Sequence, residues 1–176
     1  MTSSPIPAEL PQSPRVRYHF HAHLHGLPRE VRRAAEGVSI AGPMGGERVV
    51  TPLELSDLQR STPLTRSFEE VGEQLSQLAR LYFEPDGSFV WVGEGEEEQS
   101  TAGSRWQVDG NLYDLNGQLL YVELKGHCPP EMFDELLRAC GWPEQPVMFQ
   151  LLRHALYLDE SSFRHWATTS ITQPSV

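Results

Sequence analysis

The sequence predicts an α+β fold in a single domain, with a mainly antiparallel sheet packed against helices. Three observations lead to this class. Residues 15–26, RVRYHFHAHLHG, alternate between apolar and polar side chains, as a half-buried strand does. Apolar residues recur at helical spacing in 67–83 and again in 130–140. Asn116 and Gly117 form a hairpin signal between two long alternating segments, which indicates antiparallel pairing.

The first third of the chain is expected to contain one strand and little other regular structure. Residues 1–14 include four prolines and little to bury, which predicts a disordered arm. The folded domain is expected to cover 15–168, followed by a tail at 169–176. Residues 42–65 mix glycine, proline, serine and threonine with short apolar segments, so we expect an ordered loop region without a helix.

The helix predicted over 67–83 is the clearest in the sequence. Ser67 and Glu70 form a capping box at its start, and Pro85 with Gly87 imposes a turn after it. The next segment, SFVWVGE, predicts a strand, and the acidic GEGEEEQSTAG predicts a solvated loop.

Further elements are expected after the acidic loop. A hairpin turns at Asn116-Gly117, and a helix over 130–140 ends with Gly141 as its C-terminal cap. Residues 146–158, PVMFQLLRHALYL, stay open between two assignments. Pro146 could begin a helix, while VMFQLL could form a buried strand.

Composition limits the function classes. The chain has 176 residues, 24 acidic against 14 basic, and a net charge of -10, so its average surface repels nucleic acid and membranes. A polyanion would need a local basic patch. No stretch approaches the roughly 20 apolar residues that cross a bilayer, which predicts no membrane partner. Cys128 and Cys140 lack C-x-x-C spacing, which favours reduced thiols in the cytoplasm.

The histidines of the first strand fall at every second position. In a strand, His19, His21, His23 and His25 share one face with Arg17, while the alternate apolar residues share the face that meets the core. The residues expected to be buried are Val16, Tyr18, Phe20, Ala22 and Leu24.

Three uses of this histidine row stay open. Imidazoles two residues apart lie about 7 Å from each other along a strand, so a pair could ligate Zn, Cu, Ni or Fe. A tetrahedral site needs ligands from several elements, however, and His127, His154 and His165 show no spacing that predicts convergence. We therefore expect a hydrated polar face without a stoichiometric metal. A surface that gains positive charge on acidification is the third use.

The hairpin register determines whether its carboxylates can meet. With a two-residue turn, Asp109 and Glu123 face opposite sides of the sheet, and both faces mix apolar and charged residues. A three-residue loop of Leu115, Asn116 and Gly117 separates the two kinds of residue and puts Asp109 directly opposite Glu123. The hydrophobic pattern therefore predicts the three-residue loop.

Two carboxylates directly opposite in a sheet repel each other, so a positive charge is expected beside them. Lys125 and Arg105 could supply it as ion pairs. A divalent cation could also bridge the acids, since Mg²⁺ takes one or two carboxylates together with substrate oxygens.

These residues resemble the PD-(D/E)xK, or restriction-endonuclease-like, superfamily. VDG ends in the acid of one hairpin strand, and ELK on the next strand supplies the E-x-K. The expected order over residues 67–152 is similar to that family's core of one helix, three strands, a helix and a further strand. The chain departs from the pattern in having Val108 where the family prefers proline, and in lacking a surface rich in lysine and arginine.

The resemblance implies a metal-dependent phosphodiesterase or nuclease that acts on nucleic acid. It implies that Asp109 and Glu123 hold Mg²⁺ or Mn²⁺. It further implies that Lys125 orients or activates the attacking water and stabilises charge on the phosphate, with help from Gln107 or Arg105.

The alternative is a non-enzymatic, acidic protein-binding module of the inhibitor or immunity type. Such a module would engage a basic protein partner through the polar sheet face or the GEGEEEQ loop. It predicts a flat or convex sheet face on which the acids are paired. The enzyme instead needs Asp109, Glu123 and Lys125 to converge in a concave site.

Overall fold

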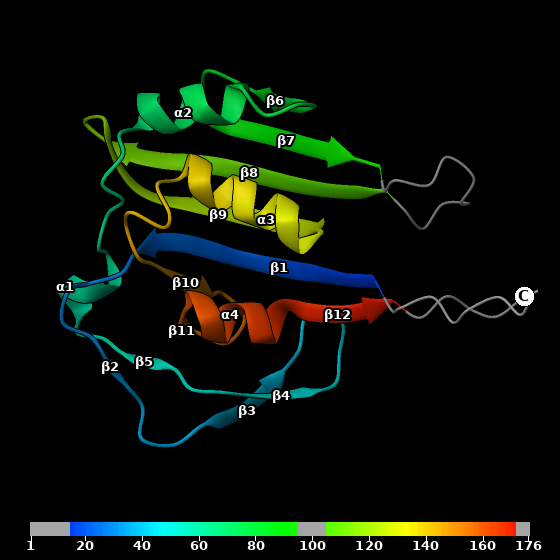
Figure 1. The fold of residues 1–176 in the computed structure, drawn as a ribbon. Coiled ribbons are helices and arrows are strands. Elements are labelled where there is room, and N and C mark those ends of the chain that lie inside the picture. Colours follow the sequence, from blue (N-terminus) through cyan, green and yellow to red (C-terminus); the bar gives the residue numbers. More distant parts are fainter. Residues whose placement is uncertain (1–14, 95–104, 172–176) are drawn as a thin grey trace, which may run out of the picture.

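The computed structural model describes residues 15–94 and 105–171, so the predicted arm at 1–14 and most of the predicted acidic loop lie outside the described residues. One antiparallel eight-stranded sheet organises the fold, in the order β11-β10-β1-β9-β8-β7-β6, and β12 also pairs with β1 (Figure 1). The strands of this sheet are β1 (Arg15–Gly26), β6 (Leu81–Phe83), β7 (Ser88–Gly93), β8 (Trp106–Leu115), β9 (Gln118–Cys128), β10 (Val147–Leu151), β11 (Leu156–Asp159) and β12 (Thr168–Ile171).

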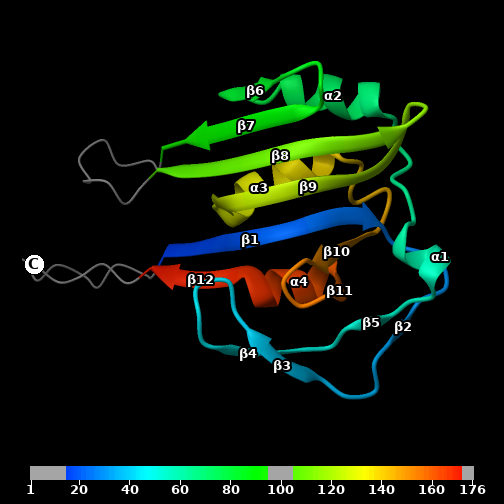
Figure 2. The ribbon, with the colours of Figure 1, turned by 180° about the vertical axis from the view of Figure 1, so that it is seen from behind.

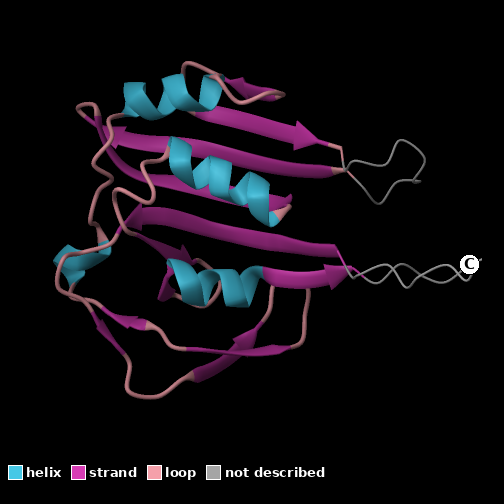
Figure 3. Ribbon diagram, viewed as in Figure 1, coloured by secondary structure: helices cyan, strands magenta, loops and turns pink. Residues whose placement is uncertain are grey.

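Two small ribbons and four helices complete the described structure. The ribbons pair β2 (Arg32–Arg33) with β5 (Leu53–Glu54), and β3 (Val38–Ala41) with β4 (Glu47–Val50). The helices are α1 (Asp57–Arg60), α2 (Phe68–Ser76), α3 (Pro130–Ala139) and α4 (Glu160–Ala167) (Figure 3). The α+β class and the antiparallel sheet are confirmed.

The three longer helices cover one face of the sheet and leave the other open. In Figure 1, α2, α3 and α4 lie in front of the strands. From behind, β7, β8, β9 and β1 lie in front, with α3 beyond them (Figure 2). The fold therefore has a core layer between sheet and helices and a second sheet face that these helices do not cover.

The core uses the apolar side of β1 as predicted, except at one end. Tyr18, Phe20, Ala22 and Leu24 are buried, and the rings of Tyr18 and Phe20 contact Phe133 of α3. Val16 was also expected to be buried, but 42% of its surface is exposed. It lies two residues beyond Tyr18, at the end of the strand that pairs with β12.

The helix predicted over 67–83 is shorter than the pattern suggests. The Ser67–Glu70 capping box is present, but α2 ends at Ser76. Arg80 adopts a left-handed φ of 62°, after which Leu81 pairs with Trp91 and begins β6. Burial of Leu81 against the sheet outweighs the helical spacing of the same residues.

Three other segments extend or correct the sequence predictions. A short helix, α1, occurs within 42–65, where none was expected, because Ser56 and Gln59 form a capping box. Residues 146–158 form the β10–β11 hairpin, which resolves the open choice in favour of strands. Residues 169–171, assigned to the tail, belong to β12.

The turn between β8 and β9 contains two residues instead of the predicted three. Leu115 pairs with Gln118 across Asn116 and Gly117. Both turn residues have positive φ angles, 55° and 81°, as the type I′ turn favoured by Asn-Gly requires. The three-residue loop is therefore wrong.

A β-bulge restores the separation of faces that the two-residue turn alone would destroy. Tyr113 pairs with Tyr121 and Asp114 with Leu119, so Leu120 is an extra residue on β9. One inserted residue reverses the alternation of a strand. The separation of faces requires one extra residue in the hairpin, and that residue lies in β9 and not in the turn.

The bulge shifts the partners of both candidate acids. Asp109 lies opposite Lys125, and Glu123 lies opposite Asn111. The predicted opposition of Asp109 and Glu123 is therefore wrong, although both residues remain on the same face.

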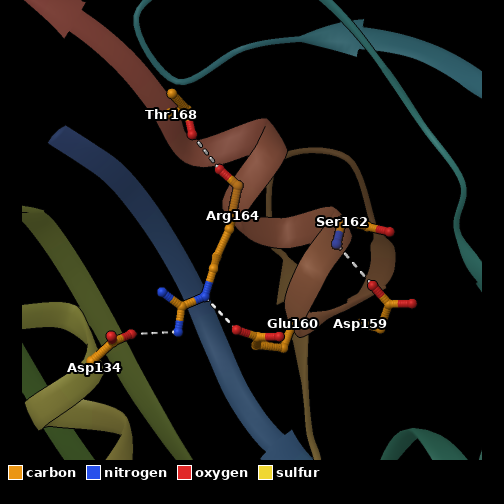
Figure 4. Close-up of polar contacts among 6 residues, drawn as sticks. All are labelled: Asp134, Asp159, Glu160, Ser162, Arg164 and Thr168. Atoms are coloured by element: carbon orange, nitrogen blue, oxygen red, sulfur yellow. Dashed lines mark hydrogen bonds and ion pairs between the residues drawn. The ribbon is translucent and has the colours of Figure 1, made fainter. Parts of the chain in front are cut away.

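An arginine ties the two helices over the middle of the sheet. Arg164 of α4 forms an ion pair with Asp134 of α3, with 2.6 Å between Nη2 and Oδ1, and its Nε donates to Glu160 (Figure 4). At the start of α4, Asp159 accepts a 2.8 Å hydrogen bond from the Ser162 amide, which caps the helix. The charged cluster thus fixes α4 against α3.

In the part of the chain that the structure describes, no helix is both long and apolar enough to cross a membrane.

Candidate functional site

The open sheet face, which we call the polar face, carries all four residues that the sequence predicts as catalytic. Strands β8, β9 and β1 place three residues side by side in each row across it. The rows are Gln107, His127 and His19; Asp109, Lys125 and His21; and Asn111, Glu123 and His23.

Glu123 is held by two neighbours on the polar face. Its Oε1 lies 3.1 Å from Nε2 of His21, and its Oε2 accepts a 3.2 Å hydrogen bond from the Tyr113 hydroxyl. The hydrogen bond with His21 lowers the pKa of Glu123 and outweighs the opposing effect of burial, with further help from Tyr113. Glu123 is therefore an ionised partner of His21.

Asp109 has different contacts from Glu123. Its Oδ1 accepts a 2.7 Å hydrogen bond from Nε2 of Gln107, the neighbour on its own strand. Lys125 faces it across the strand pair. Among the described residues, no group of three or more His, Cys, Asp or Glu side chains is placed to hold a metal ion. The two acids thus share a face without sharing a set of contacts.

Aromatic rings cover the end of the polar face nearest the β8–β9 turn. Tyr113 stacks on Tyr121 with 4.6 Å between ring centroids, and Tyr121 stacks on His23 at 4.5 Å. His25 extends this row, with its ring 5.4 Å from Tyr121 and 6.0 Å from Tyr157.

Two residues on the predicted hydrated face of β1 are buried. Only 5% of the surface of His25 and of Arg17 is exposed. The Arg17 guanidinium donates a 2.7 Å hydrogen bond to the Arg105 carbonyl. Burial lowers the pKa of His25 to about 4, helped by the nearby charge of His23. The hydrated face predicted for the histidine row therefore applies to His21, which is exposed, and in part to His19 and His23.

One edge of β1 is interrupted at its middle. On that edge β12 pairs with residues as far as Tyr18, and β10 begins its pairing at Ala22. Within the described chain, no strand pairs with residues 19–21 on this side. The same residues pair with β9 on the other side, where His21 lies opposite Lys125.

A pocket of about 460 Å³, which we call the edge pocket, opens at this interruption. Its apolar wall includes Trp166 of α4, whose indole N–H donates a 3.0 Å hydrogen bond to the Ala41 carbonyl. Its charged and titratable lining residues are His19, His21, Lys125, His127, Arg153 and His154. Among the described residues that line it, none is an aspartate or a glutamate.

Two imidazoles of the edge pocket stack on each other. The rings of His19 and His127 lie 4.7 Å apart at an angle of 6°. Burial lowers the pKa of His19, and the charges of His127 and Arg17 lower it further. The protonated form of His19 is therefore disfavoured unless a negative charge lies close by.

Three of the six charged and titratable residues of the edge pocket stand out in the sequence, although nothing there relates them to one pocket. The alternation of β1 found His19 and His21, and the E-x-K pattern found Lys125. Arg153 and His154 come from the turn after β10, and no spacing in the sequence relates that turn to β1. The alternation of β9 offered one unused signal, because His127 follows Lys125 by two residues and therefore shares its face.

The cysteines are not part of the site. Cys128 and Cys140 are buried and form no disulfide. Burial raises the pKa of Cys140 to about 12 and raises that of Cys128 as well. Neither thiol is a candidate nucleophile, because a nucleophilic cysteine needs an accessible thiolate.

No family model, no curated protein and no solved structure matches this chain.

Proposed function

We propose that this protein binds a small organic anion, a phosphate ester or a carboxylate, in the edge pocket. One observation carries the proposal. A chain with net charge -10 collects Lys125, Arg153 and four imidazoles around one cavity whose described lining contains no carboxylate. Such local clustering of one sign of charge is what concentrates an oppositely charged ligand.

The chemistry of the lining suits an oxyanion. Lysine provides a strong point charge, arginine a planar pair of donors, and each imidazole an N–H donor. The volume lies within the range of roughly 300–1,000 Å³ that small-molecule pockets occupy. Trp166 and Met44 add an apolar wall for the organic part of the ligand.

Removing the fixed charges of the edge pocket is expected to weaken binding. Lys125→Met and Arg153→Met should each lower the affinity for adenosine monophosphate by about tenfold, which corresponds to about 1.4 kcal/mol. Arg60→Met is the matched control, because Arg60 lies on α1 and does not line the pocket. Isothermal titration calorimetry with adenosine monophosphate, inorganic phosphate and citrate separates phosphate esters from carboxylates. Failure of all three to bind would contradict the proposal.

A basic protein is a poorer match to this pocket than a small anion. Its cations would meet Lys125 and Arg153, which carry the same sign. Glu123 and the aromatic row lie nearer the β8–β9 turn and outside the pocket lining.

Metal-dependent phosphodiester cleavage is the second candidate function. The observation that favours it is the common face of Asp109, Glu123 and Lys125, with Lys125 opposite Asp109. Mg²⁺ and Mn²⁺ need only one or two carboxylates when water and substrate complete the coordination.

The metal-dependent candidate predicts cleavage of DNA or RNA in Mn²⁺ that a chelator stops. Asp109→Asn should abolish that cleavage, because the amide has no charge with which to hold the cation. Asp57→Asn, on α1, is the matched control. Gel assays of single-stranded and double-stranded substrates provide the measurement. Equal activity with and without chelator would eliminate this candidate.

A further inference from the structure

We infer that the edge pocket cleaves an RNA-type phosphodiester by acid–base chemistry that requires no metal. The inference rests on the proposed function, because the phosphate must first bind in this pocket. It assigns His21 as the base, His127 as the acid and Lys125 as the group that stabilises charge on the phosphate.

His21 has the arrangement of an oriented base. His21 is one of the residues that line the edge pocket, and its Nε2 contacts the Glu123 carboxylate at 3.1 Å. When Nε2–H donates to Glu123, the lone pair of the imidazole resides on Nδ1. Glu123 is itself fixed by the Tyr113 hydroxyl. A carboxylate that orients an imidazole in this way also stabilises the imidazolium formed by proton transfer.

A second imidazole and a lysine lie on the neighbouring strand. Lys125 is directly opposite His21, and His127 follows it by two residues on the same face. Such diagonal neighbours lie about 7–8 Å apart, with their Cβ atoms somewhat closer, which leaves room for a phosphate between the two imidazoles. His127 Nε2 lies 3.3 Å from the Arg105 carbonyl, which holds its ring in place.

The proposed step balances without an added reagent. His21 takes the proton from the ribose 2′-hydroxyl, and the 2′-oxygen forms a bond to phosphorus. The bond between phosphorus and the 5′-oxygen breaks, and that oxygen receives a proton from His127. The products are a 2′,3′-cyclic phosphate and a free 5′-hydroxyl. Lys125 stabilises the charge that develops on the phosphate oxygens during the step.

This step selects its substrate class by chemistry. DNA has no 2′-hydroxyl, so it can bind without being cleaved. The edge pocket has the volume for about one nucleotide, which favours single-stranded RNA over a duplex.

The test uses the full chain in a chelating buffer, with the dinucleotide UpA and its 2′-deoxy analogue as probes. We expect the chelated protein to cleave UpA to the 2′,3′-cyclic phosphate and to leave the deoxy analogue intact. His21→Ala and His21→Gln should each reduce the rate by at least about 100-fold, the usual loss for a general base. Both substitutions fall at an exposed position, so the fold should persist. His165→Ala, at an exposed histidine of α4, should retain the full rate.

Glu123 is a positioning residue in this scheme. Glu123→Gln should lower kcat with little change in KM, because the amide keeps the contact but not the charge that favours the imidazolium. A merely structural role predicts equal damage to binding and turnover.

Binding of uridine 3′-phosphate, followed by NMR, separates the two proposals. Binding without UpA cleavage would overturn the acid–base inference and leave the anion site standing. Absence of both binding and cleavage would overturn both. Cleavage that survives in both His21 variants would show a contaminating ribonuclease and overturn the inference.

Discussion

Replacing Arg164 with alanine is expected to lower the free energy of unfolding by about 2 kcal/mol or more. The substitution leaves the carboxylates of Asp134 and Glu160 without their shared cation, and their side chains are only 30% and 27% exposed. It also removes a guanidinium that lies 5.3 Å from the Phe133 ring and 5.5 Å from the Trp142 ring. Partial exposure of the cluster keeps the loss below the 3–5 kcal/mol typical of a fully buried pair.

Chemical denaturation at neutral pH measures this effect. Arg164→Lys should lose less stability than the alanine variant, because lysine keeps the charge but not the two-pronged geometry. Arg60→Ala removes an exposed ion pair with Asp57, so it should change stability by less than about 0.5 kcal/mol. A loss for Arg164→Ala no larger than that of Arg60→Ala would show that the cluster does not tie α4 to α3.

Acidification is expected to destabilise the protein through His25. Its pKa falls from 6.5 to about 4 on folding, so the unfolded chain binds more protons than the folded one between these values. Above pH 6.5, His25 therefore has little effect on the pH dependence of the free energy of unfolding. As the pH falls below 6.5, this free energy decreases. The loss reaches about 2 kcal/mol at pH 5 and about 3 kcal/mol near pH 4. Among the described residues, neither ring nitrogen of His25 has a hydrogen-bond partner of good geometry, and the amide of Gln150 only partly offsets the cost of charging the ring.

The His25→Phe variant isolates this contribution. Phenylalanine keeps the ring against Tyr121 and Tyr157 but does not titrate. The difference between its unfolding free energies at pH 7 and pH 5 should be smaller than that of the wild-type protein by about 2 kcal/mol. His165→Gln, at an exposed histidine, should show the wild-type difference. An unchanged pH dependence in the phenylalanine variant would refute this assignment.

Local patterns predicted those elements whose residues carry their own signals. The alternation of β1, the capping box of α2 and the positive-φ Gly141 that ends α3 all appear where the sequence places them. The β6 strand was not predicted, because Leu81 falls at helical spacing with the residues of α2. In the fold, Leu81 is buried beside Trp91 instead. Such a choice depends on a neighbouring strand and cannot be read from one segment.

The candidate site was predicted less completely than the fold. The sequence placed Asp109, Glu123, Lys125 and Gln107 on one face correctly, because keeping the apolar residues together on the other face requires one extra residue between Asp109 and Glu123. It paired Asp109 with the wrong residue because alternation does not distinguish an extra residue in the turn from a bulge at Leu120. The edge pocket could not be predicted from the sequence, because it forms where β10 and β12 both end before the middle of β1.

The position of β1 at the start of the sheet-forming sequence also affects how the protein folds during synthesis. This strand leaves the ribosome before any of its partners, which all lie between residues 118 and 171. Throughout that interval an alternating strand with two unpaired edges is exposed to other nascent chains, a state that favours intermolecular pairing. Pairing between such distant segments also slows folding, toward the milliseconds to seconds typical of sheet-rich domains. Synthesis rate and chaperone supply should therefore affect the yield of this protein.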